Sequence, residues 1–143
     1  MALMLLLPPV NINSQCKSFF RSRCLPQLSP YTFNGEVFAE TFFDKDTGIV
    51  DFVFYANQQY RVGVCFQNTL PNTYFEVVDK DGVVYFSSKN MVKKDNTFHY
   101  WDFKTNTTIP LKIKVYTLGD EKGTSSTGLT PSGCVVILTG FKE

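Results

Sequence analysis

The segment Gln59–Phe66 alternates its side chains with a period of two. Its apolar residues are separated by single residues of other kinds; they are Tyr60, Val62, Val64 and Phe66. Neighbouring side chains of a strand point to opposite faces, so this order gathers all four on one face and leaves Arg61, Gly63 and Cys65 on the other. The pattern predicts a strand with one face in a core.

Similar runs rich in aromatic and β-branched residues extend along the chain. They are Tyr31–Phe43, Ile49–Tyr55, Tyr74–Asp79, Val83–Ser88, Thr97–Phe103, Ile109–Leu118 and Gly133–Phe141. We find no helical period, and 143 residues suffice for one domain but not two. About eight strands without strand–helix alternation predict an all-β fold, an antiparallel β-sandwich or jelly roll over residues 31–143.

Turn-forming residues separate these runs. Asn34-Gly35 predicts a turn or bulge inside the first strand, and Ala56–Gln58 predicts a short hairpin connection. Lys80-Asp81-Gly82 is the clearest hairpin signal, because Asp-Gly supplies the positive φ of a tight turn. Leu25–Pro30 reads as an extended entry segment and Gly119–Ser132 as a long mobile loop.

The four cysteines, Cys16, Cys24, Cys65 and Cys134, contain no Cys-x-x-Cys pair. This spacing suggests neither a zinc ribbon nor a redox motif, and an even number favours two disulfides in an oxidising compartment. We expect Cys16 to pair with Cys24, which is close in sequence, and Cys65 to pair with Cys134 in another strand-like segment. The alternative is four buried free thiols in a cytosolic protein.

The N-terminus has the order of a signal peptide. An apolar run, Met1–Val10, precedes the polar stretch Asn11–Gln15. We therefore expect residues 1–14 to be removed before Gln15, residues 15–30 to form a cysteine-containing N-terminal segment, and the protein to be secreted, periplasmic or at the cell surface. The alternative is a buried N-terminal strand or helical turn, which the Pro8-Pro9 pair interrupts.

Two segments carry a family resemblance. Gln59-Tyr60-Arg61-Val62-Gly63-Val64 is followed by Phe75-Glu76-Val77-Val78-Asp79-Lys80-Asp81-Gly82-Val83-Val84-Tyr85. This order resembles bacterial pre-peptidase C-terminal domains and related secreted β-sandwiches, over the last two-thirds of the chain. The positions of the cysteines also resemble small secreted bacterial proteins of unassigned role. The resemblance implies an accessory or cell-envelope module with no catalytic residues to carry over.

The net charge and the kinds of reactive side chain in the sequence argue against two classes of function, nucleic-acid binding and catalysis. Fourteen basic and thirteen acidic residues nearly cancel, so the sequence lacks the excess of positive charge that is typical of proteins that bind nucleic acid. The only histidine, His99, has no nucleophile motif beside it, and bonded cysteines cannot form thiolates, so we expect His99 to be an ordinary strand position and the protein not to be an enzyme.

Two groups of residues are candidate sites. Asp44, Asp46 and Asp51 have the alternation of a weak calcium site, although Asp and Gly also serve tight turns; we expect no other cofactor. Tyr100 and Trp101 point to opposite faces of a strand, so one ring is a candidate to contact a ligand, while the other reading is that Trp101 fills the core.

Three functions remain open. The first is a non-catalytic binding or structural module that contacts a protein or glycan through an exposed aromatic or apolar patch. The second is an assembly subunit of an extracellular filament or envelope complex that pairs through an open edge strand. The third is a small glycan hydrolase using two carboxylates among Glu36, Glu40, Asp44 and Asp51.

Overall fold

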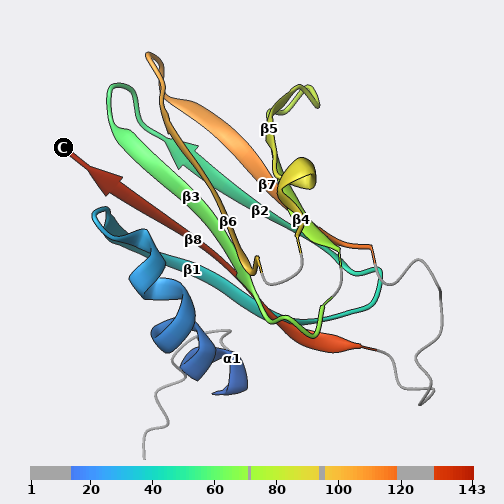
Figure 1. The fold of residues 1–143 in the computed structure, drawn as a ribbon. Coiled ribbons are helices and arrows are strands. Elements are labelled where there is room, and N and C mark those ends of the chain that lie inside the picture. The colour runs from blue at the N-terminus through green and yellow to red at the C-terminus, as the bar shows by residue number, and fades with distance from the viewer. Residues whose placement is uncertain (1–13, 71, 94–95, 119–130) are drawn as a thin grey trace, which may run out of the picture.

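The computed structural model describes residues 14–70, 72–93, 96–118 and 131–143. In this part, eight strands form two antiparallel four-stranded sheets, confirming the predicted all-β sandwich (Figure 1). The strands are β1 (Thr32–Phe43), β2 (Thr47–Phe54), β3 (Gln59–Phe66), β4 (Thr73–Val78), β5 (Val84–Ser87), β6 (Phe98–Lys104), β7 (Ile109–Thr117) and β8 (Ser132–Lys142). Sheet A has the order β1-β8-β3-β6, and sheet B has the order β2-β7-β4-β5.

The alternation of apolar side chains in β3 places one face of this strand in the core, as the sequence predicted. Its four apolar residues all lie in the core between the sheets, where Phe75 and Ile113 of sheet B are fully buried. The other face of β3 is also covered, because Cys65 belongs to a second buried cluster on the outside of sheet A. Apolar burial on both faces of sheet A therefore stabilises it from two sides.

The predicted Asp-Gly hairpin is confirmed. Gly82 has φ +83°, and β4 pairs with β5 across this turn. The carboxylate of Asp79 accepts hydrogen bonds from the amides of Asp81 and Val83 at 2.9 and 3.0 Å. The bulge predicted at Asn34-Gly35 is also present, as a register shift between Phe33 and Val37 in β1.

The hairpin predicted at Ala56–Gln58 is wrong. It joins β2 of sheet B to β3 of sheet A, so it crosses between the sheets rather than pairing two strands. The amide of Asn57, which has φ +66°, donates to Thr105 O at 2.7 Å, and the Ala56 amide donates to Thr108 Oγ1 at 3.1 Å. Turn-forming residues serve a sheet-to-sheet connection as well as a hairpin.

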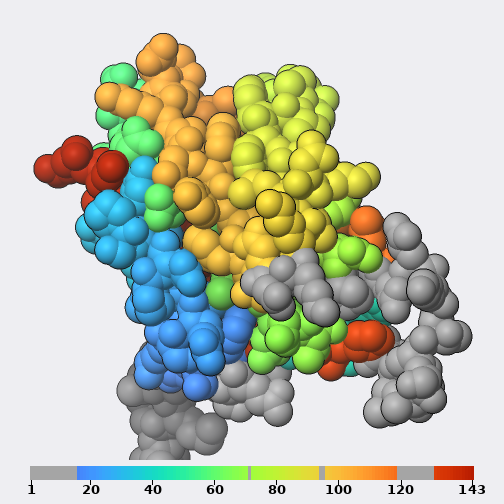
Figure 2. Space-filling view, in the orientation of Figure 1, coloured from blue at the N-terminus to red at the C-terminus, as the bar shows by residue number. Residues whose placement is uncertain are grey.

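Short helical segments precede the strands, which the sequence did not predict. They are α1 (Ser14–Phe19), the π-helical η1 (Phe20–Cys24) and the 3-10 helix η2 (Leu25–Leu28), the last replacing the expected extended entry segment. Segments this short show no periodicity of their own, and tertiary packing determines their conformation. Phe20 and Leu28 pack with Ala39, Val136 and Leu138 on the outer face of sheet A. In Figure 2 this segment, in blue, lies beside β6, in orange.

All four cysteines form disulfides, but the expected pairing is wrong. Cys16 is bonded to Cys134 and Cys24 to Cys65, with Cα–Cα distances of 5.5 and 5.6 Å. Cys16 and Cys24 are eight residues apart in a helical segment, so about 12 Å of helix rise separates them, and both face the sheet. Each therefore bonds to a different central strand, β8 or β3. The predicted signal peptide falls mostly on residues 1–13, and the loop mostly on residues 119–130, both outside the described residues.

Candidate binding surface

A groove opens between β1 and β2, the edge strands that lie on the same side of the two sheets. A tight turn joins these strands at one end, where Phe43 N donates to Asp46 Oδ2 at 2.7 Å. Toward the other end they diverge and enclose a hollow of about 540 Å³. Its lining includes Asn34 and Glu36 of β1. It also includes residues 51–55, which are the last four residues of β2 and the residue that follows the strand. A hollow of this size can admit side chains of a partner molecule.

The groove has an aromatic floor. Phe54 and Tyr60, which are 1% and 7% exposed, line it together with Phe141. The rings of Phe54 and Tyr60 meet edge to face with centroids 5.0 Å apart. The hydroxyl of Tyr60 accepts a hydrogen bond from the Tyr55 amide at 3.0 Å, so the polar end of this ring has a partner. The floor is therefore a rigid continuation of the core.

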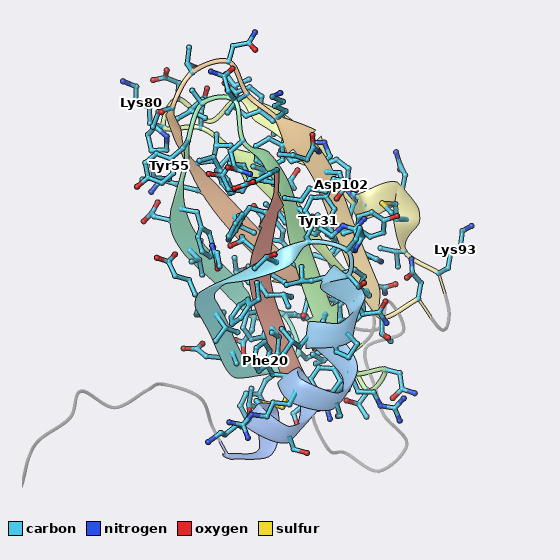
Figure 3. All side chains as sticks on the ribbon, turned by 90° about the vertical axis from the view of Figure 1, so that its left-hand side faces the viewer. Phe20, Tyr31, Tyr55, Lys80, Lys93 and Asp102 are labelled. Carbon is cyan, nitrogen blue, oxygen red and sulfur yellow. A yellow bond between two sulfur atoms is a disulfide. The ribbon has the colours of Figure 1, made fainter. Side chains whose placement is uncertain are left out.

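The strand β2, which forms one side of the groove, carries exposed apolar side chains, and two of them, Val53 and Tyr55, line the groove. Ile49, Val53 and Tyr55 project from or just beyond β2 with 53, 53 and 63% of their surface exposed. Tyr55 is labelled at the end of this strand in Figure 3. The predicted exposed aromatic or apolar patch is present here, on an edge strand rather than in the middle of a face. Exposed apolar rows of this kind are typical of surfaces that bind a partner.

Two of the four carboxylates considered for hydrolysis share this groove. Glu36 and Asp51 line it from opposite strands, whereas Glu40 and Asp44 are not among its lining residues. Glu36 is exposed, and Asp51 Oδ1 accepts an ion-pair contact from Lys112 Nζ at 3.1 Å. A general acid at neutral pH needs a carboxyl group in apolar surroundings, and these two side chains lie in water.

The calcium candidates are dispersed. Asp46 accepts the hydrogen bond that closes the turn between β1 and β2, next to Lys45 with φ +67°. Asp51 instead faces Lys112 on the outer face of sheet B, and Asp44 remains in the turn. Within the described ranges, no three His, Cys, Asp or Glu side chains gather in a way that could hold a metal ion.

Tyr100 and Trp101 lie on opposite faces of β6. The Trp101 ring points inward and stacks on Phe86 and Phe103, with centroids 5.5 and 4.2 Å away. Tyr100 points outward and is 42% exposed, but the guanidinium of Arg61 lies over its ring. Thus Trp101 belongs to the packed interior, and one face of Tyr100 already has a partner.

His99 is buried on β6. Its Nδ1 lies 2.8 Å from Ser88 Oγ, which also accepts a hydrogen bond from the Phe75 amide at 2.9 Å. Among the described residues, His99 Nε2 has no hydrogen-bond partner, and the ring meets Phe66 edge to face. Burial lowers the pKa of His99, so the imidazole is neutral at pH 7.

These features define a class: a disulfide-bonded, two-sheet β-sandwich with an open groove and an apolar edge. No model of a known protein family matches the sequence, and no curated protein matches it. The fold is similar to the crystal structure of Aeromonas hydrophila PliG, a periplasmic lysozyme inhibitor of g-type lysozyme. The TM-score is 0.50 at 14% identity, over 75% of this chain and 85% of that one. No helix in the described part is long and apolar enough to cross a membrane.

The sequence did not reveal the groove, because it forms where two strands of different sheets diverge. One signal for its rim was available. In Ile49–Phe54 every residue except Asp51 is apolar, so both faces of this strand carry apolar side chains. With only one face in the core, the remaining apolar residues had to be exposed or covered by a partner.

Proposed function

We propose that this protein is an exported, non-catalytic binding protein that binds another protein, and that its partner is an enzyme of the lysozyme class. The observation that carries protein binding is the row of exposed side chains Ile49, Val53 and Tyr55 along and just beyond β2, of which Val53 and Tyr55 line the groove. Apolar side chains that flank a preformed hollow gain free energy when a partner removes them from water.

Export is supported by the cysteines. Both disulfides of the structure join buried sulfurs, and disulfides persist in oxidising compartments such as the bacterial periplasm. The apolar run Met1–Val10, with the order of a signal peptide, supports the same location. A periplasmic or secreted protein would meet enzymes that act on the cell wall.

The choice of a lysozyme follows from the similar solved structure, which is that of a periplasmic lysozyme inhibitor. A fold hosts many functions, so this likeness selects the first partner to test. The resemblance to pre-peptidase C-terminal domains implies an accessory role and is compatible with this proposal.

The proposal is tested with the oxidised protein that begins at Gln15. We expect it to slow the clearing of a cell-wall suspension by g-type lysozyme and to bind that enzyme in calorimetry. The matched variant is Val53→Glu, with Lys80→Glu on the β4–β5 hairpin as a control for added negative charge. We expect Val53→Glu to weaken binding about tenfold and Lys80→Glu to leave it unchanged. A protein that neither binds nor inhibits lysozymes would contradict the lysozyme part of the proposal.

The open edge of β2 also favours a second candidate, an assembly subunit that pairs with copies of itself. Sedimentation at increasing concentration separates the two. A monomer over the whole range supports the binding protein, whereas chains that lengthen with concentration and shorten in Val53→Glu support assembly. The hydrolase alternative predicts that the protein alone releases sugar from cell wall and that Glu36→Gln stops this release.

A further inference from the structure

We infer that the free edge of β2 receives an extended, basic segment of the partner as an added strand. This inference deepens the proposed function and rests on it, because it names the surface and the chemistry by which a protein partner is bound. Three features of the molecule support it: the direction of the backbone groups in β2, the space beside them and the charge around that space.

The backbone groups of alternate β2 residues point toward the groove. Directly opposed residues in an antiparallel pair alternate between those that exchange hydrogen bonds and those that point away. Thr117 N donates to Asp46 O at 3.0 Å, so the even-numbered residues up to Phe54 face β7, and the register has no shift. In agreement, the amide of odd-numbered Tyr55 donates to Tyr60 Oη instead. Hence Ile49, Asp51 and Val53 direct their amides and carbonyls to the free edge.

The other edge strands are less suitable templates. β1 is interrupted by the bulge at Gly35, where Glu36 N donates to Asn34 Oδ1 at 2.9 Å and Asn34 Nδ2 donates to Thr139 Oγ1. Bulges end regular pairing at an edge. β5 has four residues, and β6 carries both Asp102 and Lys104. β2 has eight residues, a continuous register and one charged side chain.

The groove leaves room for the added strand. Residues 51–55 line it consecutively, so its wall is the edge of the strand itself and not one face of side chains. Its floor is aromatic, as described for Phe54, Tyr60 and Phe141. An extended peptide hydrogen-bonded to this edge would alternate its side chains between the floor and the outer rim.

The acidic residues around the groove favour basic residues in the added strand. Glu36 and Asp51 are lining residues on the two sides of the groove, with the Asp51 carboxylate at its outer margin beside Lys112, and no lysine or arginine is among its described lining residues. Lys112 contacts Asp51 from sheet B, but the two side chains are 43 and 75% exposed, and such surface pairs are weak. Basic side chains of an incoming segment therefore gain favourable contacts with both carboxylates, whereas acidic ones are repelled.

The first experiment uses a synthetic peptide of alternating valine and lysine, and a matched peptide with glutamate in place of lysine. Backbone amide exchange is followed by NMR in the full oxidised protein. Without peptide, we expect the amides of Ile49, Asp51 and Val53 to exchange fast and those of Val50 and Phe52 to be protected. The lysine peptide should slow exchange at the first three by at least tenfold, and the glutamate peptide should not. Protection elsewhere, or by both peptides alike, would overturn the inference.

The second experiment separates the backbone from the side chain at one position. Val53→Pro removes an amide that points away from β7, while Val53→Ala removes apolar surface and keeps that amide. We expect the proline variant to bind the lysine peptide about two- to tenfold more weakly than the alanine variant, the worth of one hydrogen bond. Equal urea midpoints show that both are folded. Equal binding by the two variants would rule out strand addition.

The third experiment tests charge. Glu36→Gln and Asp51→Asn should each weaken binding of the lysine peptide about two- to fivefold, and Lys112→Gln should strengthen it. Asp81→Asn, on the distant hairpin, is the control and should change nothing. Lysozyme binding is measured with the same variants. If the peptide binds and lysozyme does not, the proposed partner is wrong and the edge site stands. If lysozyme binds equally to Val53→Pro and Val53→Ala, the edge site is wrong and the proposed function stands.

Discussion

The guanidinium of Arg61 on β3 lies over the ring of Tyr100 on β6, with its carbon 4.3 Å from the ring centroid. Its other side lies over Tyr31, at 4.6 Å, and its nitrogens donate to both oxygens of Asp102 at 2.7 and 2.9 Å. A further nitrogen donates to the carbonyls of Gln27 and Ser29. Tyr31 and Asp102 are labelled side by side in Figure 3. Arg61 thus fastens the end of the N-terminal segment to sheet A.

We therefore expect Arg61→Lys to be destabilising although it keeps the charge. Lysine cannot make the paired contact with Asp102, which also raises the pKa of Arg61, and it stacks less well between two rings. The side chain is 13% exposed, so the loss should be about 1 to 2 kcal/mol in urea unfolding. Arg21→Lys, at an exposed position of η1, is the control and should change stability by less than about 0.5 kcal/mol.

The stability of the fold should decrease in mildly acidic solution because of His99. Burial lowers its pKa in the folded state, so below an unfolded pKa of about 6.5 the unfolded chain takes up a proton that the folded protein does not. Stability is then full above that pH and falls as the pH decreases toward the folded pKa, by at most about 1.4 kcal/mol per pH unit.

Urea midpoints measured between pH 8 and 5.5 check this. His99→Asn keeps a polar group near Ser88 and does not titrate, so its midpoints should stay level over the range, at a lower overall stability. The chain has no second histidine to confuse the comparison. The same slope in both proteins would show that the dependence has another origin.

The disulfide pairing is open to direct mapping. Trypsin cleaves after Lys17, Arg21 and Arg23, which separates Cys16 from Cys24. Under non-reducing conditions we expect mass spectrometry to find the Cys16 peptide joined to the Cys134 peptide and the Cys24 peptide joined to the Cys65 peptide. A joined pair of Cys16 and Cys24 peptides would contradict the structure.

Each bridge should also contribute substantially to stability. They close loops with sequence separations of 118 and 41, which corresponds to about 4 to 5 kcal/mol each in the chain-entropy picture. We expect the double variant Cys24→Ser/Cys65→Ser to lower the unfolding free energy by about this amount, and Cys16→Ser/Cys134→Ser by slightly more. Unchanged urea midpoints would show that the bridges are dispensable.

The proposed export gives a further prediction. The mature protein purified from its native compartment should begin at Gln15 or a near neighbour and have a mass four hydrogens below the reduced chain, because two bridges have formed. An intact Met1 together with four alkylatable thiols would contradict both the leader and the oxidising location.

Local patterns predicted local structure well. The alternation in β3 and the Asp-Gly turn after β4 depend on neighbouring residues, and both are confirmed. The partner of Cys16 depends instead on a strand 118 residues away, so spacing along the chain favoured its near neighbour Cys24. Ala56–Gln58 carries turn residues, but its destination is set by which sheet the next strand joins.

For the candidate site, too, local features could be predicted from the sequence, whereas features that depend on distant segments could not. That an apolar patch would be exposed was predictable from the surplus of apolar residues in Ile49–Phe54. That it would flank a groove was not, since the groove depends on where β1 leaves β2 and on the bulge at Gly35. Tyr100 and Trp101 were correctly expected on opposite faces, but their neighbours Arg61 and Phe86 come from other strands.

The position of β8 has a consequence for how the chain acquires its shape. The last strand in sequence lies between β1 and β3, and both hydrogen-bond to it. A nascent chain in which β8 has not yet been made has no described strand on which β1 can pair, and Cys16 lacks its partner Cys134. β1 can therefore join sheet A only once β8 has been made, so this pairing brings together two distant segments of the chain, as does the Cys16–Cys134 bridge with its sequence separation of 118.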